Sequence, residues 1–389
     1  MKILFFTHYS ELYGANKSLL DLIDGLVLVY KIEPYVILPR EGAIISMLNE
    51  KQIPYAIVNF NQWCEIKQRT SRHPFRYVKK VIENKNRIHK LNKFNEEQIF
   101  KVKESITNFN PDYVYSNSSV FNFGFLFAKK FNIKHIWHFR EFGEKDYNLV
   151  FFNKKNVVNC FNKSDKIIAI SNAIKFFYKT NYFVKNIEVA YNSVLSMSVL
   201  EKIDTRKENK KVRNSSEIVF GIVGLLHKNK GQEDAIRAFK LVNSLYPETK
   251  LLIAGTGNQQ DLLNLTTDLN ITSKVEFLGH IEDPFDAFLN MDVNLMCSRN
   301  EGLGRVTIEA MAASIPTIGY RGGGTIEIIK EYQTGLFYEN NYQNLSEKMI
   351  FLIENESKRI EMGINARKIF QENYLNEIYA SSIYEIITN

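Results

Sequence analysis

Residues 297–327 read CSRNEGLGRVTIEAMAASIPTIGYRGGGTIE, and this stretch decides the fold. A strand-like apolar run, residues 293–296, leads into it, and residues 306–313 then carry apolar side chains at helical spacing. Pro316 ends the helix pattern, because proline has no amide hydrogen and clashes inside a helical turn. A second short apolar run leads into the triple glycine 322–324, after which another helix pattern begins. The stretch therefore predicts two successive strand–loop–helix units of an α/β fold.

Each of these helices begins after a loop that contains glycine. Exposed backbone amides and the helix dipole make such a helix start suitable for a phosphate group. Two carboxylates frame the first helix, Glu301 in the loop before it and Glu309 in its second turn. Because helical side chains lean toward the N-terminus, Glu309 can reach back toward the same place. Carboxylates accept hydrogen bonds from vicinal hydroxyls, so two acids beside a diphosphate suggest a nucleotide sugar.

Glu301 and Glu309 are separated by seven residues, and EGLGRVTIEAMAASIP followed by GGGTIEII resembles the E-x7-E block of retaining, family 4 type glycosyltransferases, the glycosyl transferases group 1. In that family the first glutamate lies at the donor sugar and the second holds the nucleotide ribose. The resemblance assigns these roles to Glu301 and Glu309. The loop and helix start between them is then expected to bind the donor through Gly302, Leu303, Gly304, Arg305 and Val306. Two solvated glutamates in an ordinary αβ unit are the alternative interpretation.

A cation is expected near the donor diphosphate, because negative charge develops on a departing nucleotide. Lys230, followed by Gly231, resembles the lysine–glycine pair that contacts the diphosphate in this family. Relatives usually carry an arginine five residues earlier, where this chain has Leu225. Lys228 and Arg299 are the candidates to replace it. A solvated surface lysine is the alternative interpretation of Lys230.

Further family segments match in shorter stretches. Gly279, His280 and Ile281 follow a strand pattern and resemble the segment that contacts the nucleotide base, mostly through its backbone. Gly14 precedes a helix pattern and resembles the glycine of the family's first loop. His138 ends a strand pattern in HIWHFREFG and resembles the histidine that faces the donor sugar. A turn requirement for the glycines and a structural role for the histidine are the alternatives.

The length of 389 residues suits two domains. The resemblance implies the GT-B arrangement, an α/β fold of two Rossmann-like domains that face each other across a cleft. We expect the acceptor-binding domain at 1–197, a charged linker at 198–217 and the nucleotide-sugar-binding domain at 218–374. The last segment, 375–389, is expected to form a C-terminal helix that crosses back to the first domain.

Basic residues are concentrated between residues 62 and 103, where 12 Lys and Arg face 4 Glu among interleaved aromatic and aliphatic residues. One interpretation is a surface for anionic membrane lipids or a lipid-diphosphate acceptor. The other is a solvated helical insertion. No nucleic-acid module accompanies the charge, so no nucleic-acid partner is expected.

The three cysteines are scattered, which fits a reducing cytoplasm rather than a disulfide framework or a zinc site. The N-terminus lacks the pattern of a signal peptide, and no apolar run reaches the roughly 18 to 20 residues that span a bilayer. A cytoplasmic protein, at most peripheral at the inner face of a membrane, is therefore expected. The sequence has no Asp-x-Asp motif, and neither a metal nor a cofactor is expected.

The sequence as a whole predicts a retaining, metal-independent glycosyltransferase of the hexosyltransferase type. It is expected to move a sugar from a nucleoside-diphosphate sugar, with UDP favoured, to a glycan or lipid-linked acceptor in cell-surface polysaccharide biosynthesis. Glu301, His138 and Lys230 are its expected catalytic residues. A catalytically silent nucleotide-binding protein of the same fold is the first alternative. A nucleotide-dependent oxidoreductase or epimerase is the second.

Overall fold

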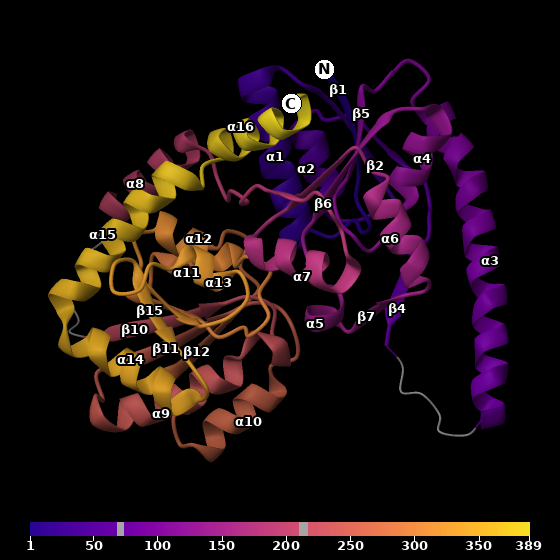
Figure 1. Cartoon of the computed structure of the whole chain (residues 1–389). Coiled ribbons are helices and arrows are strands. Elements are labelled where there is room, and N and C mark those ends of the chain that lie inside the picture. The colour runs from indigo at the N-terminus through magenta and orange to yellow at the C-terminus, as the bar shows by residue number, and fades with distance from the viewer. Residues whose placement is uncertain (68–73, 210–216) are drawn as a thin grey trace. The chain divides into compact units, whose positions relative to one another are not determined.

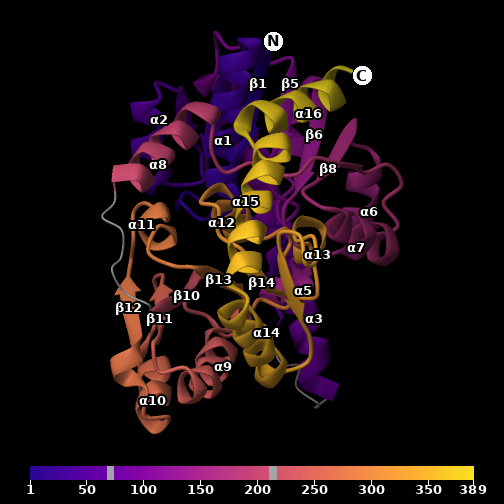
Figure 2. The same cartoon turned by 90° about the vertical axis from the view of Figure 1, so that its left-hand side faces the viewer.

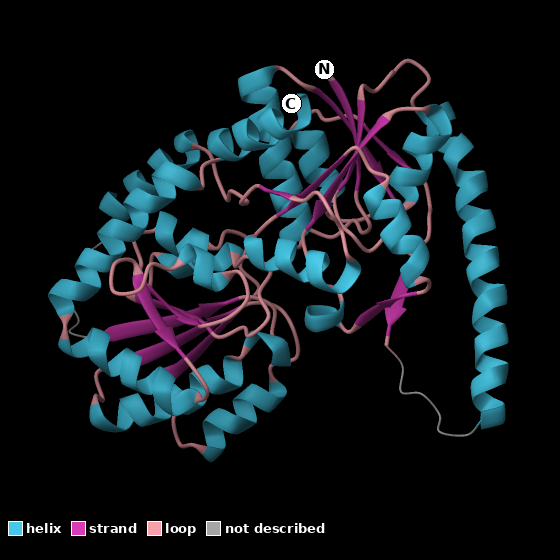
Figure 3. Ribbon diagram, in the orientation of Figure 1, coloured by secondary structure: helices cyan, strands magenta, loops and turns pink. Residues whose placement is uncertain are grey.

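The computed structural model describes residues 1–67, 74–209 and 217–389 (Figure 1). They form two compact units. The first contains Met1–Tyr191 together with Tyr379–Asn389, and the second contains Asn192–Ile378. Each unit has its own parallel sheet flanked by helices (Figure 3).

The described part of the first unit contains a seven-stranded sheet with the order β3-β2-β1-β5-β6-β8-β9, and every pair of neighbours in it is parallel. Its strands are β1 (Lys2–Phe6), β2 (Glu33–Leu38), β3 (Tyr55–Ile57), β5 (Tyr113–Ser116), β6 (Lys134–Phe139), β8 (Lys166–Ala169) and β9 (Glu188–Val189). Two further strands, β4 (Cys64–Ile66) and β7 (Leu149–Phe151), form a separate antiparallel pair.

Both faces of this sheet are buried, which explains the continuous apolar strand patterns of the sequence. Ile3 and Phe5 of β1 pack into one core and Leu4 and Phe6 into another, because successive side chains of a strand point to opposite faces. The helices of this unit are α1 (Gly14–Tyr30), α2 (Ile44–Glu50), α3 (Pro74–Ser105), α4 (Phe123–Phe131), α5 (Glu144–Tyr147), α6 (Lys154–Asn162) and α7 (Asn172–Tyr182). Among the described residues, no helix is both long and apolar enough to cross a membrane.

The C-terminal helix α16 (Asn376–Thr388) completes the first unit. Tyr379, Ala380, Ile383 and Ile387 are buried in the same core as α1 and α2. Tyr384 also stacks on Tyr30 of α1, with 3.8 Å between the ring centroids. The predicted return of the chain to the first domain is therefore confirmed.

The described part of the second unit contains a six-stranded parallel sheet with the order β12-β11-β10-β13-β14-β15, and Figure 2 shows most of these strands across the view. Its strands are β10 (Ile218–Val223), β11 (Thr249–Ala254), β12 (Val275–Gly279), β13 (Val293–Met296), β14 (Thr317–Tyr320) and β15 (Gly335–Tyr338). The order reverses between β10 and β13, and in open α/β sheets ligands bind beside the carboxyl ends of strands at such a point.

Helices and short turns connect these strands. They are α9 (Gln232–Leu245), α10 (Gln260–Asp268), α11 (Phe285–Phe288), α12 (Arg305–Ala312), α13 (Thr325–Ile328), α14 (Tyr342–Glu354), α15 (Glu356–Asn373) and the 3-10 turns η1 (Lys228–Lys230) and η2 (Thr272–Lys274). The prediction of an α/β fold with two Rossmann-like domains is confirmed.

The first part of the segment predicted as a linker, residues 198–209, is helical. It begins within α8 (Met197–Asn209), which belongs to the second unit. Leu200 and Ile203 are buried although charged and polar residues surround them in the sequence. Two apolar residues at positions i and i+3 lie on the same side of a helix and can be buried together. A pattern of only two residues in a charged segment is too short to predict a helix.

Candidate active site

The loop that carries Glu301 is packed against the triple-glycine loop. The backbone amide of Gly324 donates a hydrogen bond to the carbonyl of Glu301, at 2.8 Å. A Cβ atom at Gly324 would overlap the carbonyl oxygen of Gly302, and one at Gly323 would overlap that of Glu301. Glycine is therefore required because two backbones meet here. The contact fixes the position from which the Glu301 side chain emerges.

Lys230 reaches the same place from another strand. It ends η1, the turn after β10, and Gly231 follows with a φ of 72°. A Cβ at Gly231 would lie 2.6 Å from the Cβ of Cys297, so the turn rests directly on the residue after β13. As a result, the Nζ of Lys230 lies 2.9 Å from Oε2 of Glu301. The order of the sheet brings together a cation and an acid that are 71 residues apart.

Glu301 is held in its ionised form. Burial alone would raise the pKa of its carboxyl group, but the charge of Lys230 and hydrogen bonds from Lys230 and Ser298 outweigh burial and lower the pKa. Its side chain retains 18% exposure and that of Lys230 retains 34%. Glu301 can therefore accept hydrogen bonds from the hydroxyls of a ligand, and Lys230 offers that ligand a positive charge. The sequence did not identify Ser298, which resembles an ordinary loop serine.

Glu309 does lean toward the start of its helix, but its Oε1 already accepts a hydrogen bond. The donor is Nε of Arg305, one helical turn earlier, at 2.9 Å. The guanidinium group of Arg305 also donates to the carbonyls of Ser193 and Val194, at 3.4 and 3.2 Å. Only 7% of the Glu309 side chain is exposed. Arg305 thus fixes this carboxylate beside the first turn of α12.

The start of α12 has the features of an anion-binding helix terminus. Gly304 precedes the helix with a φ of 101°, which glycine adopts at low cost. Leu303 is buried and Val306 is half-buried. The hydroxyl of Thr307 is buried with no hydrogen-bond partner among the described residues, and so is that of Thr325 at the start of α13. Sequence reasoning missed both threonines, whose only signal was a hydroxyl in the first turn of each helix.

The two candidate replacements for the family arginine differ. Leu225 is 43% exposed, and its carbonyl accepts a hydrogen bond from the side chain of Gln232 at 2.8 Å. Arg299 is directed to Asp234, at 3.4 Å, and its guanidinium lies 5.3 Å from the ring of Tyr320. Lys228 is exposed, begins the same turn as Lys230, and forms no ion pair with another described residue. Lys228 is therefore the cation that remains available beside Lys230.

Gly279, His280 and Ile281 lie after β12, at the same edge of the sheet. Gly279 has a φ of 65°, and its carbonyl accepts a hydrogen bond from the amide of Gly255 at 2.8 Å. Gly255 in turn packs so closely on Gly224 that a Cβ would overlap the Gly224 carbonyl. The side chain of His280 is exposed and that of Ile281 is half-buried. The segment therefore presents mainly backbone at this edge.

The remaining two predicted site residues belong to the first unit. Gly14 is the first residue of α1, is exposed, and has no atom within 4 Å of the position of a Cβ. Packing therefore does not explain why residue 14 is glycine. The loop before it is held by Asn16, whose side-chain amide donates to the carbonyls of Tyr9 and Glu11 at 2.9 and 2.8 Å.

His138 lies near the end of β6 and is fully buried. Its Nδ1 is 2.5 Å from the hydroxyl of Tyr115, and its Nε2 has no hydrogen-bond partner among the described residues. Burial and the nearby charge of Arg140 hold the pKa of His138 well below its usual range. The imidazole is therefore neutral at physiological pH. It can either donate or accept one hydrogen bond through Nε2.

The two residues that follow this strand are also buried. Nε of Arg140 donates to Oδ1 of Asn117 at 2.5 Å, and Oε1 of Glu141 accepts hydrogen bonds from the hydroxyls of Ser118 and Ser119, both at 2.7 Å. Burial raises the pKa of Glu141 despite these hydrogen bonds. The polar residues after β5 thus stabilise the charged residues after β6.

In the described parts of the chain, no cluster of three or more His, Cys, Asp and Glu side chains could hold a metal ion. Two of the ion pairs that involve residues after β13 contain predicted site residues, namely Lys230, Glu301, Arg305 and Glu309. The first two form one ion pair and the last two form another.

Comparisons with known proteins identify relatives. Residues 204–369 match the family described as glycosyl transferases group 1. The chain is 27% identical over 241 residues to the capsular polysaccharide biosynthesis glycosyltransferase CapM of Staphylococcus aureus, covering 60% of this chain and 63% of CapM. It is 29% identical over 231 residues to the N-acetyl-alpha-D-glucosaminyl L-malate synthase of Bacillus anthracis, covering 58% and 59%. The matches thus span less than two thirds of both curated relatives.

The fold has solved counterparts over its full length. The crystal structure of Anabaena HepE in complex with UDP superposes with a TM-score of 0.78 at 20% identity and covers 100% of both chains. A second structure of HepE, in complex with UDP-glucose, gives a TM-score of 0.75. These structural neighbours are GT-B glycosyltransferases, which agrees with the two Rossmann-like units.

Proposed function

We propose, from the premise that residues 204–369 form a glycosyl transferases group 1 domain, that the chain is a glycosyltransferase. It moves a sugar from a nucleoside-diphosphate sugar to a glycan or lipid-linked acceptor in cell-surface polysaccharide biosynthesis. The observation that carries the proposal is the Lys230–Glu301 pair, 2.9 Å apart, beside the start of α12. It combines a cation for a diphosphate with an ionised acceptor for sugar hydroxyls.

The proposed donor is a UDP-sugar. HepE, whose structure resembles this chain, is described in complex with UDP and with UDP-glucose. In our proposal the nucleotide base contacts the backbone of Gly279 to Ile281, and the ribose hydroxyls contact the free oxygen of Glu309. Arg305 supports this role because it holds Glu309 in place and offsets its charge.

The proposed chemistry depends on stabilising the leaving diphosphate. Lys230, the available Lys228 and the amides at the start of α12 would offset the charge that develops as the sugar–phosphate bond breaks. Because these groups supply the positive charge, the reaction is proposed to proceed without a metal. Glu301 would orient the sugar through its hydroxyls.

We propose that transfer retains the anomeric configuration without a covalent intermediate. Glu301 is already engaged by Lys230 and Ser298, which lowers its pKa and its strength as a nucleophile. The acceptor hydroxyl would attack on the face from which the diphosphate leaves, and its proton would pass to the departing phosphate oxygen. Mass spectrometry after incubation with a fluorinated UDP-sugar tests this step, and detection of a glycosylated protein would contradict it.

The acceptor is proposed to lie at a membrane surface of the cytoplasm. The described part of α3 exposes Lys90 and Lys93, two basic residues that suit anionic headgroups. Residues 68–73 of the predicted basic segment lie outside the described residues. Co-sedimentation with vesicles that contain or lack phosphatidylserine tests this proposal, and equal binding to both would contradict it.

Turnover tests the activity itself. Release of UDP from a panel of UDP-sugars is measured for the wild type and for Glu301→Gln, which keeps the shape but removes the charge. Glu361→Gln is the matched control, since Glu361 is exposed on α15 and forms no ion pair with a described residue. The proposal requires release by the wild type and the control and a loss of at least a hundredfold in Glu301→Gln.

A silent nucleotide-binding protein is the second candidate. The observation in its favour is Leu225, a half-exposed apolar residue at the position where the family resemblance predicts an arginine. This candidate predicts that UDP binds while no UDP-sugar is turned over. Leu225→Arg separates the two, because a gain of turnover from zero would mean that the missing cation had silenced the site.

A further inference from the structure

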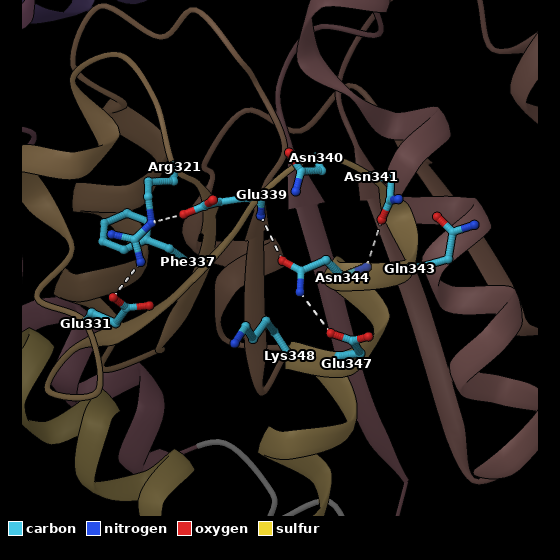
Figure 4. Close-up of a pocket in the computed structure, with 10 residues that line it drawn as sticks. All are labelled: Arg321, Glu331, Phe337, Glu339, Asn340, Asn341, Gln343, Asn344, Glu347 and Lys348. Atoms are coloured by element: carbon cyan, nitrogen blue, oxygen red, sulfur yellow. Dashed lines mark hydrogen bonds and ion pairs between the residues drawn. The ribbon is translucent and has the colours of Figure 1, made fainter.

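The second unit has a pocket of about 480 Å³ that none of the predicted site residues lines (Figure 4). It lies beside β15, the last strand of the sheet, and the first turns of α14. Its volume is within the usual range for a site that binds a small molecule. The pocket is lined by Arg321, Glu331, Phe337, Glu339, Asn340, Asn341, Gln343, Asn344, Glu347 and Lys348.

At one end of the pocket, two carboxylates more than offset the charge of an arginine. Arg321 is paired with Glu331 and with Glu339, at 2.5 Å in each case. Its guanidinium group also lies 4.5 Å from the ring of Phe337 (Figure 4). Both sides of the guanidinium fork are therefore occupied. This arginine is not available as an anchor for a phosphate.

The other end is organised by Asn344. Its side-chain oxygen accepts a hydrogen bond from the amide of Glu339, and its side-chain nitrogen donates to Glu347, both at 2.9 Å. Its own amide donates to the side chain of Asn341 at 3.1 Å. These contacts fix the wall of the pocket while the Asn340 and Gln343 side chains keep no hydrogen-bond partner among the described residues.

The lining selects one class of ligand by elimination. A phosphate is disfavoured because Arg321 is neutralised and three glutamates face two basic residues. A metal ion is disfavoured because no described group of acidic, His or Cys side chains could hold one. An apolar ligand would leave the side-chain amides of Asn340 and Gln343 without hydrogen-bond partners. A neutral, hydroxyl-rich molecule satisfies both the donors and the acceptors.

We propose that this pocket binds a neutral saccharide, the remote part of the glycan acceptor. The pocket and Glu301 belong to one unit, and their strands β13, β14 and β15 are neighbours. Two strand spacings of about 4.8 Å place β15 roughly 10 Å from the strand of Glu301. Arg299 connects the loop of Glu301 with the pocket. It lies two residues before Glu301, and its guanidinium group donates a hydrogen bond to the carbonyl of Asn340 in the pocket lining, at 3.5 Å. Only the identity of the saccharide as acceptor rests on the proposed function.

The test compares two tryptophan substitutions. Gln343→Trp places a bulky ring in the pocket without removing a side-chain hydrogen bond, since the Gln343 side chain forms none with described residues. Gln371→Trp is the matched control, because Gln371 is an exposed glutamine on α15, outside the pocket. Binding of neutral trisaccharides of glucose, galactose, mannose and N-acetylglucosamine is measured by saturation-transfer NMR and calorimetry, with and without saturating UDP.

The proposal expects at least one trisaccharide to bind the wild type and Gln371→Trp equally, whether or not UDP is present. Affinity should fall at least tenfold in Gln343→Trp. Displacement by UDP, equal binding by Gln343→Trp, binding of inorganic phosphate alone, or no binding of any saccharide would each overturn it. If UDP fails to bind while the saccharide result holds, the proposed function falls and the pocket stands. If UDP-sugars are turned over but no saccharide binds, the proposed function stands and the saccharide pocket falls.

Discussion

Replacing Lys230 with methionine should change both the rate of donor cleavage and its dependence on pH. Lys230 lies 2.9 Å from Glu301, and its charge and hydrogen bond are two of the three influences that lower the pKa of that carboxyl group. In Lys230→Met the hydrogen bond from Ser298 remains, but burial is the largest influence and raises the pKa. Glu301 should then lose its charge at a higher pH.

The expected size follows from the roles assigned to the pair. Loss of one group that stabilises developing charge costs about 10²- to 10³-fold in rate, or roughly 3 to 4 kcal/mol. The acid limb of the pH–rate profile should also move to higher pH, because Glu301 loses the cation and the hydrogen bond that lower its pKa. The wild type, whose Glu301 pKa is lowered, should keep its activity further into the acid range.

The assay is UDP release at saturating UDP-sugar between pH 4 and 9, with thermal unfolding as the check on folding. Lys358→Met is the control, because Lys358 is exposed on α15 and forms no ion pair with a described residue. A rate loss in Lys230→Met with an unchanged acid limb would refute the reasoning. It would mean that Lys230 acts on the substrate without setting the charge of Glu301.

Three further predictions concern the support of the site. Gly324→Ala should lower the free energy of unfolding by about 2 kcal/mol or more in urea denaturation, because its Cβ would overlap the backbone of Gly302. Gly14→Ala should change the free energy of unfolding by less than about 0.5 kcal/mol, because no atom lies near the position of its Cβ. Equal effects of the two substitutions would contradict the packing account. Ser298→Ala removes one of three influences that lower the pKa of Glu301, so it should raise the acid limb less than Lys230→Met does, and a larger shift would contradict the order of causes. Tyr115→Phe leaves Nδ1 of the buried His138 without its partner and should cost about 1 to 3 kcal/mol of stability, and an unchanged urea midpoint would show that this hydrogen bond contributes nothing.

Local patterns were sufficient to predict the fold class. Continuous apolar runs predicted buried parallel strands, and the glycines after them marked the turns into helices. The antiparallel pair β4–β7 was not predicted, since three-residue strands leave almost no periodicity. The sequence also could not show why glycine is required in the triple-glycine loop, because the reason is a close backbone contact with the loop of Glu301.

The site could be predicted in part. The resemblance pointed to Glu301, Glu309 and Lys230, and the structure brings Glu301 and Lys230 into contact because β10 and β13 are neighbours. The pairing of Glu309 with Arg305 has the helical spacing of four residues and was visible in principle. The pocket beside β15 was not, because each of its polar residues resembles an ordinary surface residue until the fold gathers them.

Thermal unfolding with UDP, on the wild type and on Glu309→Ala, tests the donor site most directly, with GDP, ADP and NAD as comparisons. A ligand that binds only the folded state at a hundred times its dissociation constant stabilises that state by about 2.7 kcal/mol. We predict stabilisation of the wild type by UDP and its loss in Glu309→Ala. Stabilisation by NAD alone, or by UDP equally in both proteins, would contradict a donor site at the start of α12.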